Sequence, residues 1–395
     1  MTFPERFSKL PAHAFPRLRA LIEGTPPGRT PQITLTVGEP THPMPPFLAE
    51  TLAANIDGFA KYPPNEGTPA LRTAIADWHE RRYDLALDPD SQILPLNGSR
   101  EGLFNAVLAL TPETRRGKRP LVLMPNPFYP VYEVGTLAAG AEPVHVPATA
   151  ATGHLPDYAG LPPEVLDRTA LVVVCSPSNP QGAVASRPWW HELLRLAEKH
   201  DFRILSDECY SEIWRTAPPP GALEIAAEAG ADPERVLAFN SLSKRSNLPG
   251  LRSGFVAGGP AAIAELRKLR VYGGAPLPAP LQAVAAATWA DEEHVTASRA
   301  LYAQKYAAAD EILTGLPGYT APEAGFFLWL PTEDGEATAL KLWREAGLRV
   351  LPGAYLSRTT HGDCPGAGHI RVAMVPPLDT LREALTRLRA CLDTP

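Results

Sequence analysis

The chain has 395 residues, of which 45% are hydrophobic and 20% are charged, as in an ordinary globular protein. Its 37 basic and 43 acidic side chains give a formal net charge of −6, so it lacks the basic excess of nucleic-acid and anionic-membrane binders. Widely spaced cysteines without a Cys-x-x-Cys pair argue against a disulfide framework or a zinc site and predict a reducing compartment (Cys175, Cys209, Cys364 and Cys391).

The N-terminal segment predicts neither export nor membrane insertion. Residues 1–21 mix charged residues with prolines and lack the uninterrupted apolar stretch of a signal peptide. Elsewhere no apolar run approaches the roughly 20 residues that span a bilayer. We therefore expect a cytoplasmic protein with no membrane partner, no nucleic-acid partner and no bound metal.

Up to about residue 290, helical patterns alternate with short apolar runs. A helix is predicted over 68–82, where Leu71, Ile75 and Trp78 share one face. The apolar runs are typical of strands buried on both faces, and their alternation with helices predicts an α/β domain whose mostly parallel sheet is covered by helices. The expected strands are 121–124, 143–146, 170–175, 202–205, 236–239 and 254–257, and the other helices are 100–110, 189–200 and 261–270.

After residue 290 the pattern changes to that of a smaller α+β domain. A long helix is expected over 292–314, followed by strand 325–330, helix 337–346, strand 369–374 and a closing helix. The predicted domains are an N-terminal segment that contributes to the small domain, a large domain and a small C-terminal domain (1–45, 46–290 and 291–395).

The most informative segment places a lysine directly after a predicted strand. Ser241 and Ser243 flank Lys244, and Arg252 lies eight residues further along. A nucleophilic lysine needs a lowered pKa, which burial or a nearby cation provides. Small hydroxyls and an arginine are suited to bind phosphate. An amine beside a phosphate cradle indicates a Schiff base with a phosphorylated aldehyde cofactor.

Two upstream strands end in polar residues that fit such a cofactor. Asn179 follows strand 170–175, and Asp207 ends the next strand. A buried carboxylate is costly unless it meets a cation, and a protonated ring nitrogen would serve. Tyr210 and Asn179 can each donate a hydrogen bond to a ring hydroxyl oxygen.

In this order and spacing, the chain resembles the class I/II, fold-type I family of pyridoxal-phosphate aminotransferases over nearly its full length. The resemblance implies an aspartate-aminotransferase-like fold whose large domain binds pyridoxal 5'-phosphate (PLP). It implies that Lys244 binds the cofactor covalently and transfers the proton, and that Asp207 pairs with the pyridinium nitrogen. Other residues would hold the ring oxygen (Asn179 and the catalytic Tyr210) or the phosphate (Ser241, Ser243 and Arg252).

Two further segments match family regions around the cofactor. The loop 97–102 resembles a helix start at which Ser99 and Arg100 present backbone N–H groups to the phosphate, and helix N-termini do bind anions. Segment 125–132 resembles the one whose aromatic residue stacks on the cofactor ring, which implies this role for Tyr129.

The resemblance also implies a substrate site and a partner subunit. Arg371 matches the arginine that binds the substrate α-carboxylate, and Gly38 and Asn179 would lie beside that group. Segment 61–67 resembles the loop that sends a tyrosine, here Tyr62, into the phosphate site of the neighbouring subunit. We therefore expect a homodimer with shared active sites.

Within this family, segment 241–254 is most similar to the succinyldiaminopimelate transaminases of bacterial lysine biosynthesis. The expected reaction exchanges an amino group between N-succinyl-LL-2,6-diaminopimelate and 2-oxoglutarate, with glutamate as the partner amino acid. A dianionic substrate end needs a cationic pocket, for which Arg100 and Arg245 are candidates. Another aminotransferase (aspartate, aromatic or broad-range) and a PLP-dependent C–S β-lyase stay open.

Two hypotheses from other classes do not fit. Ser241 and Lys244 match Ser-x-x-Lys of the β-lactamases, but the Ser-Asp-Asn and Lys-Thr-Gly partners of that motif are missing. A regulatory relative would need a DNA-binding module, and we expect none before residue 36 because that stretch is short and not basic.

Overall fold

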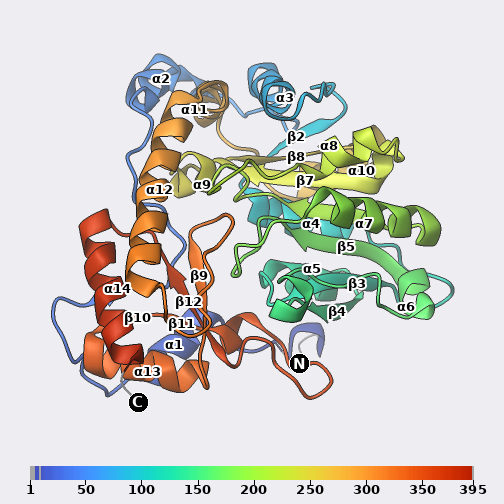
Figure 1. Ribbon diagram of the computed structural model, residues 1–395. Helices are drawn as coiled ribbons and strands as arrows, with labels where there is room; N and C mark the ends of the chain where they lie inside the picture. The colour runs from blue at the N-terminus through green and yellow to red at the C-terminus, as the bar shows by residue number, and fades with distance from the viewer. Residues whose placement is uncertain (1–4, 9, 394–395) are drawn as a thin grey trace.

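The computed structural model describes residues 5–8 and 10–393. Figure 1 shows a large sheet covered by helices beside a smaller body in which the N-terminal and C-terminal parts of the chain meet. This arrangement confirms the predicted architecture of a large α/β part with a separate small α+β part.

Over the described residues, the large sheet has seven strands in the order β2-β8-β7-β6-β5-β3-β4. β4, β3, β5, β6 and β7 run parallel, whereas β8 is antiparallel to both of its neighbours. The mostly parallel sheet is therefore confirmed. The strands are Ile93–Leu96 (β2), Leu121–Asn126 (β3), Glu142–Pro147 (β4), Thr169–Cys175 (β5), Arg203–Asp207 (β6), Val236–Ser241 (β7) and Gly254–Gly258 (β8).

Alternating side chains of the strands pack against helices on opposite faces of this sheet. Val122 and Leu171 belong to one apolar cluster, and Leu123 and Val172 belong to another, as the two-residue period of a strand requires. The first cluster includes α4 (Ser99–Leu110), α5 (Val131–Ala138) and α10 (Pro260–Gly273), and the second includes α6 (Pro163–Arg168), α7 (Arg187–His200) and α8 (Ala222–Glu228). A third cluster joins β2 and β8 to α3 (Pro69–Tyr83) and α11 (Ala279–Ala290), and α11 also packs on α2 (Leu48–Ala54).

The small part is built on a three-stranded antiparallel sheet in the described portion of the chain, in the order β11-β12-β9. A parallel pairing of β1 with β10 brings residues 33–34 beside residues 348–349, so the N-terminal segment packs with the C-terminal one. The domain borders at 45 and 290 stay a prediction. The elements are α1 (Ala14–Ile22), β1 (Ile33–Thr34), α12 (Glu293–Leu313), β9 (Phe327–Pro331), α13 (Gly335–Ala346), β10 (Leu348–Arg349), β11 (Leu351–Pro352), β12 (His369–Ala373) and α14 (Leu378–Leu392).

Helix α12 runs from the end of α11 down beside α14 and so joins the two parts (Figure 1). None of the helices within residues 5–8 and 10–393 has both the length and the apolar character needed to cross a membrane.

Candidate active site

Several predicted site residues lie near one edge of the large sheet because four parallel strands end there. β3, β5, β6 and β7 are aligned in register, with Cys175 opposite Asp207 and Asp207 opposite Phe239. In open α/β sheets, the carboxyl ends of such strands form the binding crevice. Tyr129, Asn179, Asp207 and Lys244 each end or follow one of these strands.

Lys244 lies in a one-turn helix, α9 (Leu242–Arg245), directly after β7. The Ser241 hydroxyl caps this turn by accepting a hydrogen bond from the Ser243 N–H at 3.1 Å. The lysine Nζ donates to the backbone carbonyl of Gly38, so the predicted substrate loop and the lysine meet. Burial is the main cause that lowers the pKa of Lys244 to about 8. The neutral, nucleophilic fraction of the amine therefore grows as the pH rises through about 8.

Asp207 is buried at the end of β6, with a residue exposure of 5%. The Tyr132 hydroxyl donates to its Oδ2 at 2.7 Å, and the Cys209 backbone N–H donates to its Oδ1 at 3.4 Å. Burial raises the pKa of this carboxyl. Within residues 5–8 and 10–393, no lysine or arginine forms an ion pair with Asp207. The site thus provides a buried carboxylate suited to a cationic ring nitrogen.

Tyr132 is a site residue that the sequence analysis missed. It lies in the first turn of α5, whereas Tyr129 lies in the segment that leads from β3 into this helix. Their rings meet edge to face, with centroids 5.7 Å apart. The spacing of the two tyrosines was the available signal, but only the structure brings the second hydroxyl to Asp207.

Tyr129 is held by Arg100, whose Nε donates to the tyrosine hydroxyl at 2.6 Å. Burial raises the pKa of Tyr129, so its hydroxyl stays neutral at physiological pH. Arg100 is exposed, and α4 begins one residue before it, at Ser99. The predicted stacking residue and the predicted phosphate loop are therefore in direct contact.

The N-terminus of α4 forms one side of the predicted phosphate cradle. Gly98 precedes it with φ +83°, and a Cβ built there would lie 2.4 Å from Nη2 of Arg252. Only glycine leaves room for this arginine while holding that backbone conformation. Arg252 also donates to the carbonyls of Asn97 (3.3 Å) and Pro249 (2.7 Å). A guanidinium thus lies beside the first N–H groups of a helix, which have no carbonyl partner within that helix, and this arrangement is suited to an anion.

The two serines that precede Lys244 lie close to this helix start. Ser241 pairs with Gly254, and a Cβ on that glycine would lie 3.2 Å from the backbone nitrogen of Ser99. The Ser241 and Ser243 hydroxyls are 2.8 Å apart. Cys209 completes the connection, because its thiol donates to the Ser99 hydroxyl at 3.0 Å. The residues that were predicted to bind phosphate are therefore brought together from three segments.

Arg371 forms a second cationic centre and is buried on β12 of the small sheet. Its Nη1 donates to Oδ1 of Asn179 at 3.0 Å, and its Nη2 donates to the carbonyl of Thr36 at 2.7 Å. Its Cζ lies 4.2 Å from the ring centroid of Phe327. Burial lowers the pKa of Arg371 to about 10, so the side chain stays charged at neutral pH. The structure thus brings Arg371, Asn179 and the loop of Gly38 together.

Tyr210 is buried between these centres. Its ring packs edge to face against Phe326 and Phe327, with centroid distances of 5.4 and 5.9 Å. Burial raises the pKa of Tyr210 well above 10, and the nearby Arg371 guanidinium opposes this increase. The tyrosine therefore remains a neutral hydrogen-bond donor near the carboxylate-binding arginine.

Tyr62 lies outside this cluster and is fully exposed to solvent. Its predicted role requires a second subunit, so its exposure in one chain leaves that prediction in place.

The expectation that Arg245 binds the distal end of a substrate is wrong. Arg245 is 1% exposed, and its guanidinium donates to backbone carbonyls at the end of α11 and beyond. Successive residues of a helix point about 100° apart, and Arg245 therefore points away from its neighbour Lys244 into the interior. Arg100, the other candidate, is exposed beside the predicted ring-stacking tyrosine.

Comparisons with known proteins agree with this geometry. A family model described as aminotransferase class I and II matches residues 30–388. The chain is 33% identical to the LL-diaminopimelate aminotransferase of Desulforudis audaxviator over 99% of both chains, and 31% identical to that of Dehalococcoides mccartyi over 98% of both. A solved aminotransferase from Neisseria meningitidis has a TM-score of 0.92 and 39% identity over 98% of both chains. A probable N-succinyldiaminopimelate aminotransferase from Thermus thermophilus has a TM-score of 0.83 and 27% identity, covering 96% of this chain and 100% of that one.

Proposed function

Because the chain belongs to the class I and II aminotransferases, which use PLP, we propose that it exchanges an amino group between N-succinyl-LL-2,6-diaminopimelate and 2-oxoglutarate. The names of the relatives support a diaminopimelate-type amino acid, both free and succinylated. The observation that carries the proposal is the position of Lys244, which is close enough to interact electrostatically with both Asp207 and Arg371. The lysine, the acid and the arginine suit proton transfer, charge stabilisation and carboxylate binding.

PLP, when bound, supplies an aldehyde that bonds to amines and a ring that withdraws electrons from the carbon next to the substrate nitrogen. The donor set of the site fits it, with a buried carboxylate that forms no ion pair within the described residues and a helix start flanked by Arg252. We propose that Ser99, Ser241, Ser243 and Arg252 hold the phosphate and that Tyr129 lies against the ring.

Lys244 is the proposed proton carrier. Its amine is buried, and its lowered pKa leaves part of it neutral near physiological pH, as a general base requires. Nζ is proposed to take the proton from the α-carbon of the amino acid, to hold it as the ammonium and then to give it back to the reacting group. Its hydrogen bond to the Gly38 carbonyl keeps the amine close to the loop that is proposed to border the substrate carboxylate.

Asp207 is proposed to hold the ring nitrogen in its protonated state. Two donors, the Tyr132 hydroxyl and the Cys209 N–H, fix the carboxylate in one orientation. Preorganised electrostatic partners of this kind are among the strongest contributors to catalysis. Arg371 is proposed to bind the α-carboxylate with its planar fork, and Asn179 and Tyr210 to orient the neighbouring groups.

Arg100 is proposed to recognise a distal carboxylate of the substrate. It is exposed, and the one printed contact of its guanidinium to oxygen uses Nε. Its terminal nitrogens therefore face no carboxylate or carbonyl among the described contacts. The succinyl end of the proposed substrate adds a carboxylate that free diaminopimelate lacks, which favours an arginine at this position.

The substrate proposal predicts a specific effect of Arg100→Gln. We expect kcat/KM for N-succinyl-LL-diaminopimelate to fall about tenfold, the effect of one solvent-screened charged hydrogen bond. The half-reaction with alanine, which has no distal charge, should change much less. Stopped-flow absorbance of the cofactor measures both reactions. The control is Arg195→Gln, which removes an exposed arginine on α7.

Two results would contradict the substrate proposal. Equal losses with alanine and with the succinylated substrate would mean that Arg100 acts only by holding Tyr129. A wild-type enzyme that reacts faster with free LL-diaminopimelate, aspartate or an aromatic amino acid would assign a different amino donor. Release of pyruvate from a cysteine conjugate would instead indicate the C–S β-lyase alternative.

We also propose a homodimer whose sites are shared between subunits. Large apolar side chains are exposed around α2 and the turn that follows it, including Met44, Ile56, Phe59 and Tyr62. Met44 also borders an open apolar groove of about 580 Å³ with Leu48, Leu251 and Leu281 among its lining. Exposed apolar surface of this kind marks an interface, and a second copy of the chain is the partner that the family resemblance implies.

A hybrid experiment tests the shared site. Tyr62→Ala and Lys244→Ala are each expected to be nearly inactive at limiting PLP. A dimer of one chain of each kind has one site with both side chains intact, so unfolding and refolding the two together should restore about a quarter of wild-type activity. Refolding either variant alone is the control. An absence of rescue in dimers that form, or a fully active monomer in sedimentation, would contradict the proposal.

A further inference from the structure

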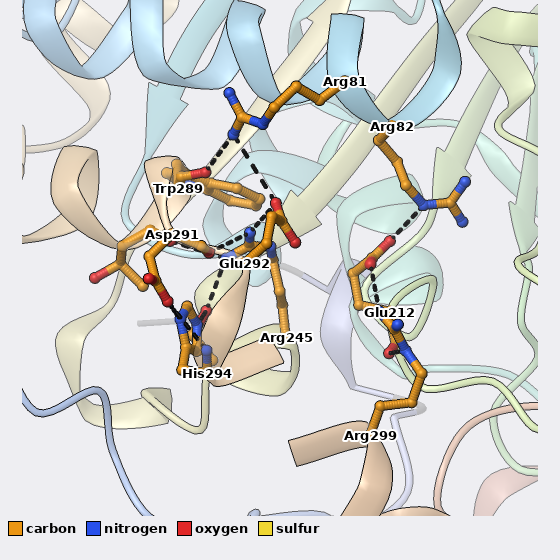
Figure 2. A network of polar contacts seen from close by, with 11 residues as sticks. Arg81, Arg82, Glu212, Arg245, Trp289, Asp291, Glu292, His294 and Arg299 are labelled. Atoms are coloured by element: carbon orange, nitrogen blue, oxygen red, sulfur yellow. Dashed lines mark hydrogen bonds and ion pairs between the residues drawn. The ribbon is translucent and has the colours of Figure 1, made fainter. Parts of the chain in front are cut away.

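Arg245, the neighbour of Lys244, is among the most deeply buried charged residues that the structure describes. Its guanidinium donates to the carbonyls of Thr288 (2.9 Å) and Asp291 (3.1 Å) and to the Glu292 carboxylate (2.6 Å). Figure 2 shows Arg245 beside Asp291 and Glu292, which lie between the end of α11 and the start of α12. Arg245 therefore ties the lysine turn to the α11–α12 junction (residues 288–294).

A second contact joins the same two segments. Nε2 of His294, in the first turn of α12, is 2.8 Å from the Ser246 hydroxyl. Its other ring nitrogen contacts Asp291, which fixes the orientation of the imidazole (Figure 2). The lysine turn is thus held to the junction by two successive residues, Arg245 and Ser246.

A contribution to the stability of the fold does not by itself explain why an arginine is buried at position 245. Burial lowers the pKa of Arg245, and its Nε has no hydrogen-bond partner among the described residues. The side chain of its carboxylate partner, Glu292, is 43% exposed, so solvent weakens the attraction between the two charges. Buried ion pairs are often no more stabilising than apolar residues of similar size, whereas they do fix one arrangement of the groups around them.

The junction is also the point at which the chain leaves the large sheet for the small one. Helix α12 begins at Glu293 and packs along α14. Arg371 lies on β12 of that small part, whereas Lys244 follows β7 of the large sheet. The contacts of Arg245 therefore connect the turn that carries the lysine to the helix that leads to the part carrying the arginine.

We propose that Arg245 is a positioning residue that aligns the amine of Lys244 with the carboxylate-binding Arg371. This inference rests on the proposed function, in which these two residues act on one amino acid. Small misplacements of a reacting group cost about 10- to 100-fold in rate, even when the altered residue does not touch the substrate. Arg245 acts through the backbone of the lysine turn and contacts neither substrate nor cofactor.

The test is Arg245→Lys, which keeps the charge but cannot make the same fork of hydrogen bonds. The matched control is Arg387→Lys, because Arg387 is also buried and also donates to backbone carbonyls and a glutamate, but in α14. With glutamate as amino donor, we expect Arg245→Lys to lower the maximal half-reaction rate about 10- to 100-fold with little change in KM. The pH midpoint of the cofactor's visible band, measured without substrate, should shift by about half a unit or more.

The control should lose thermal stability without either change. If Arg245→Lys matches Arg387→Lys in rate and in pH midpoint, the positioning role is wrong.

If Arg245→Lys does not fold, Glu292→Gln replaces it, because this variant keeps the arginine and removes its charged partner. A lower half-reaction rate together with a shifted midpoint supports the proposal, and an unchanged midpoint and rate overturn it. This test uses glutamate, so it stays valid even if the protein does not react with N-succinyl-LL-diaminopimelate. A wild-type protein that shows no visible cofactor band would instead refute the role of Lys244 itself.

Discussion

Replacing Lys244 with alanine is expected to lower kcat by about four orders of magnitude, the upper range for loss of a general acid–base group. The reason is local, because the Nζ amine is buried beside Gly38 and its lowered pKa makes it available as a base. The variant should still fold and bind PLP, because the proposed phosphate and ring contacts come from other residues. Steady-state turnover and absorbance after dialysis measure the two effects separately.

Lys305 provides a matched control for this prediction. It is also a buried lysine whose pKa burial lowers to about 8, but it donates to the Val375 carbonyl in the small part of the molecule. Lys305→Met should therefore reduce stability while keeping the cofactor band and turnover. An active Lys244→Ala variant, or equal losses in both variants, would show that a lowered lysine pKa here reflects burial alone.

Replacing Asp207 with alanine is expected to lower kcat about 10²- to 10³-fold, the range for removal of one preorganised electrostatic partner. Without this carboxylate the ring nitrogen would lose its proton and much of its electron-withdrawing effect. Asp207→Asn should be nearly as slow, because it keeps the shape but removes the charge. Covalent labelling of Lys244 should persist in both variants, so the loss lies in turnover and not in cofactor attachment. Single-turnover rates with glutamate measure it.

Glu208 is the matched control for Asp207. It is the next residue, is buried, and has a pKa that burial raises to about 7, yet it accepts from Ser206 and the Ala222 N–H. Glu208→Gln should keep most of the activity. Near-normal rates in Asp207→Ala would refute the role of the carboxylate, and a large loss in Glu208→Gln would indicate a general effect of disturbing this strand end.

The sheet could be predicted from local patterns, which also pointed to Lys244, Asn179, Asp207 and their neighbours in sequence, whereas the other site residues were expected from the family resemblance. Continuous apolar runs mark the central strands. A polar residue that follows such a run, like Asn179 or Asp207, is costly to bury unless it has a binding partner. Strand β2 escaped prediction because it has four residues, includes Pro95 and lies at the sheet edge. Such a strand carries little periodicity and loses one backbone donor.

Side-chain direction was the part that the sequence could not provide. Lys244 and Arg245 are neighbours with similar charge, and only the one-turn helix decides that one meets Gly38 and the other the α11–α12 junction. In the same way, Tyr129 and Tyr132 are close in sequence, but the hydroxyl of Tyr129 accepts from Arg100 of α4 and that of Tyr132 donates to Asp207 of β6. Such outcomes depend on tertiary contacts between distant segments.

The most direct measurement of the central claim is borohydride reduction of the PLP-loaded protein, followed by mass spectrometry of its peptides. The account predicts loss of the visible band and one cofactor mass added per chain, on Lys244. Parallel reduction of Lys244→Ala should add no mass. An unmodified Lys244, or the same mass on another lysine such as Lys305, would contradict the account.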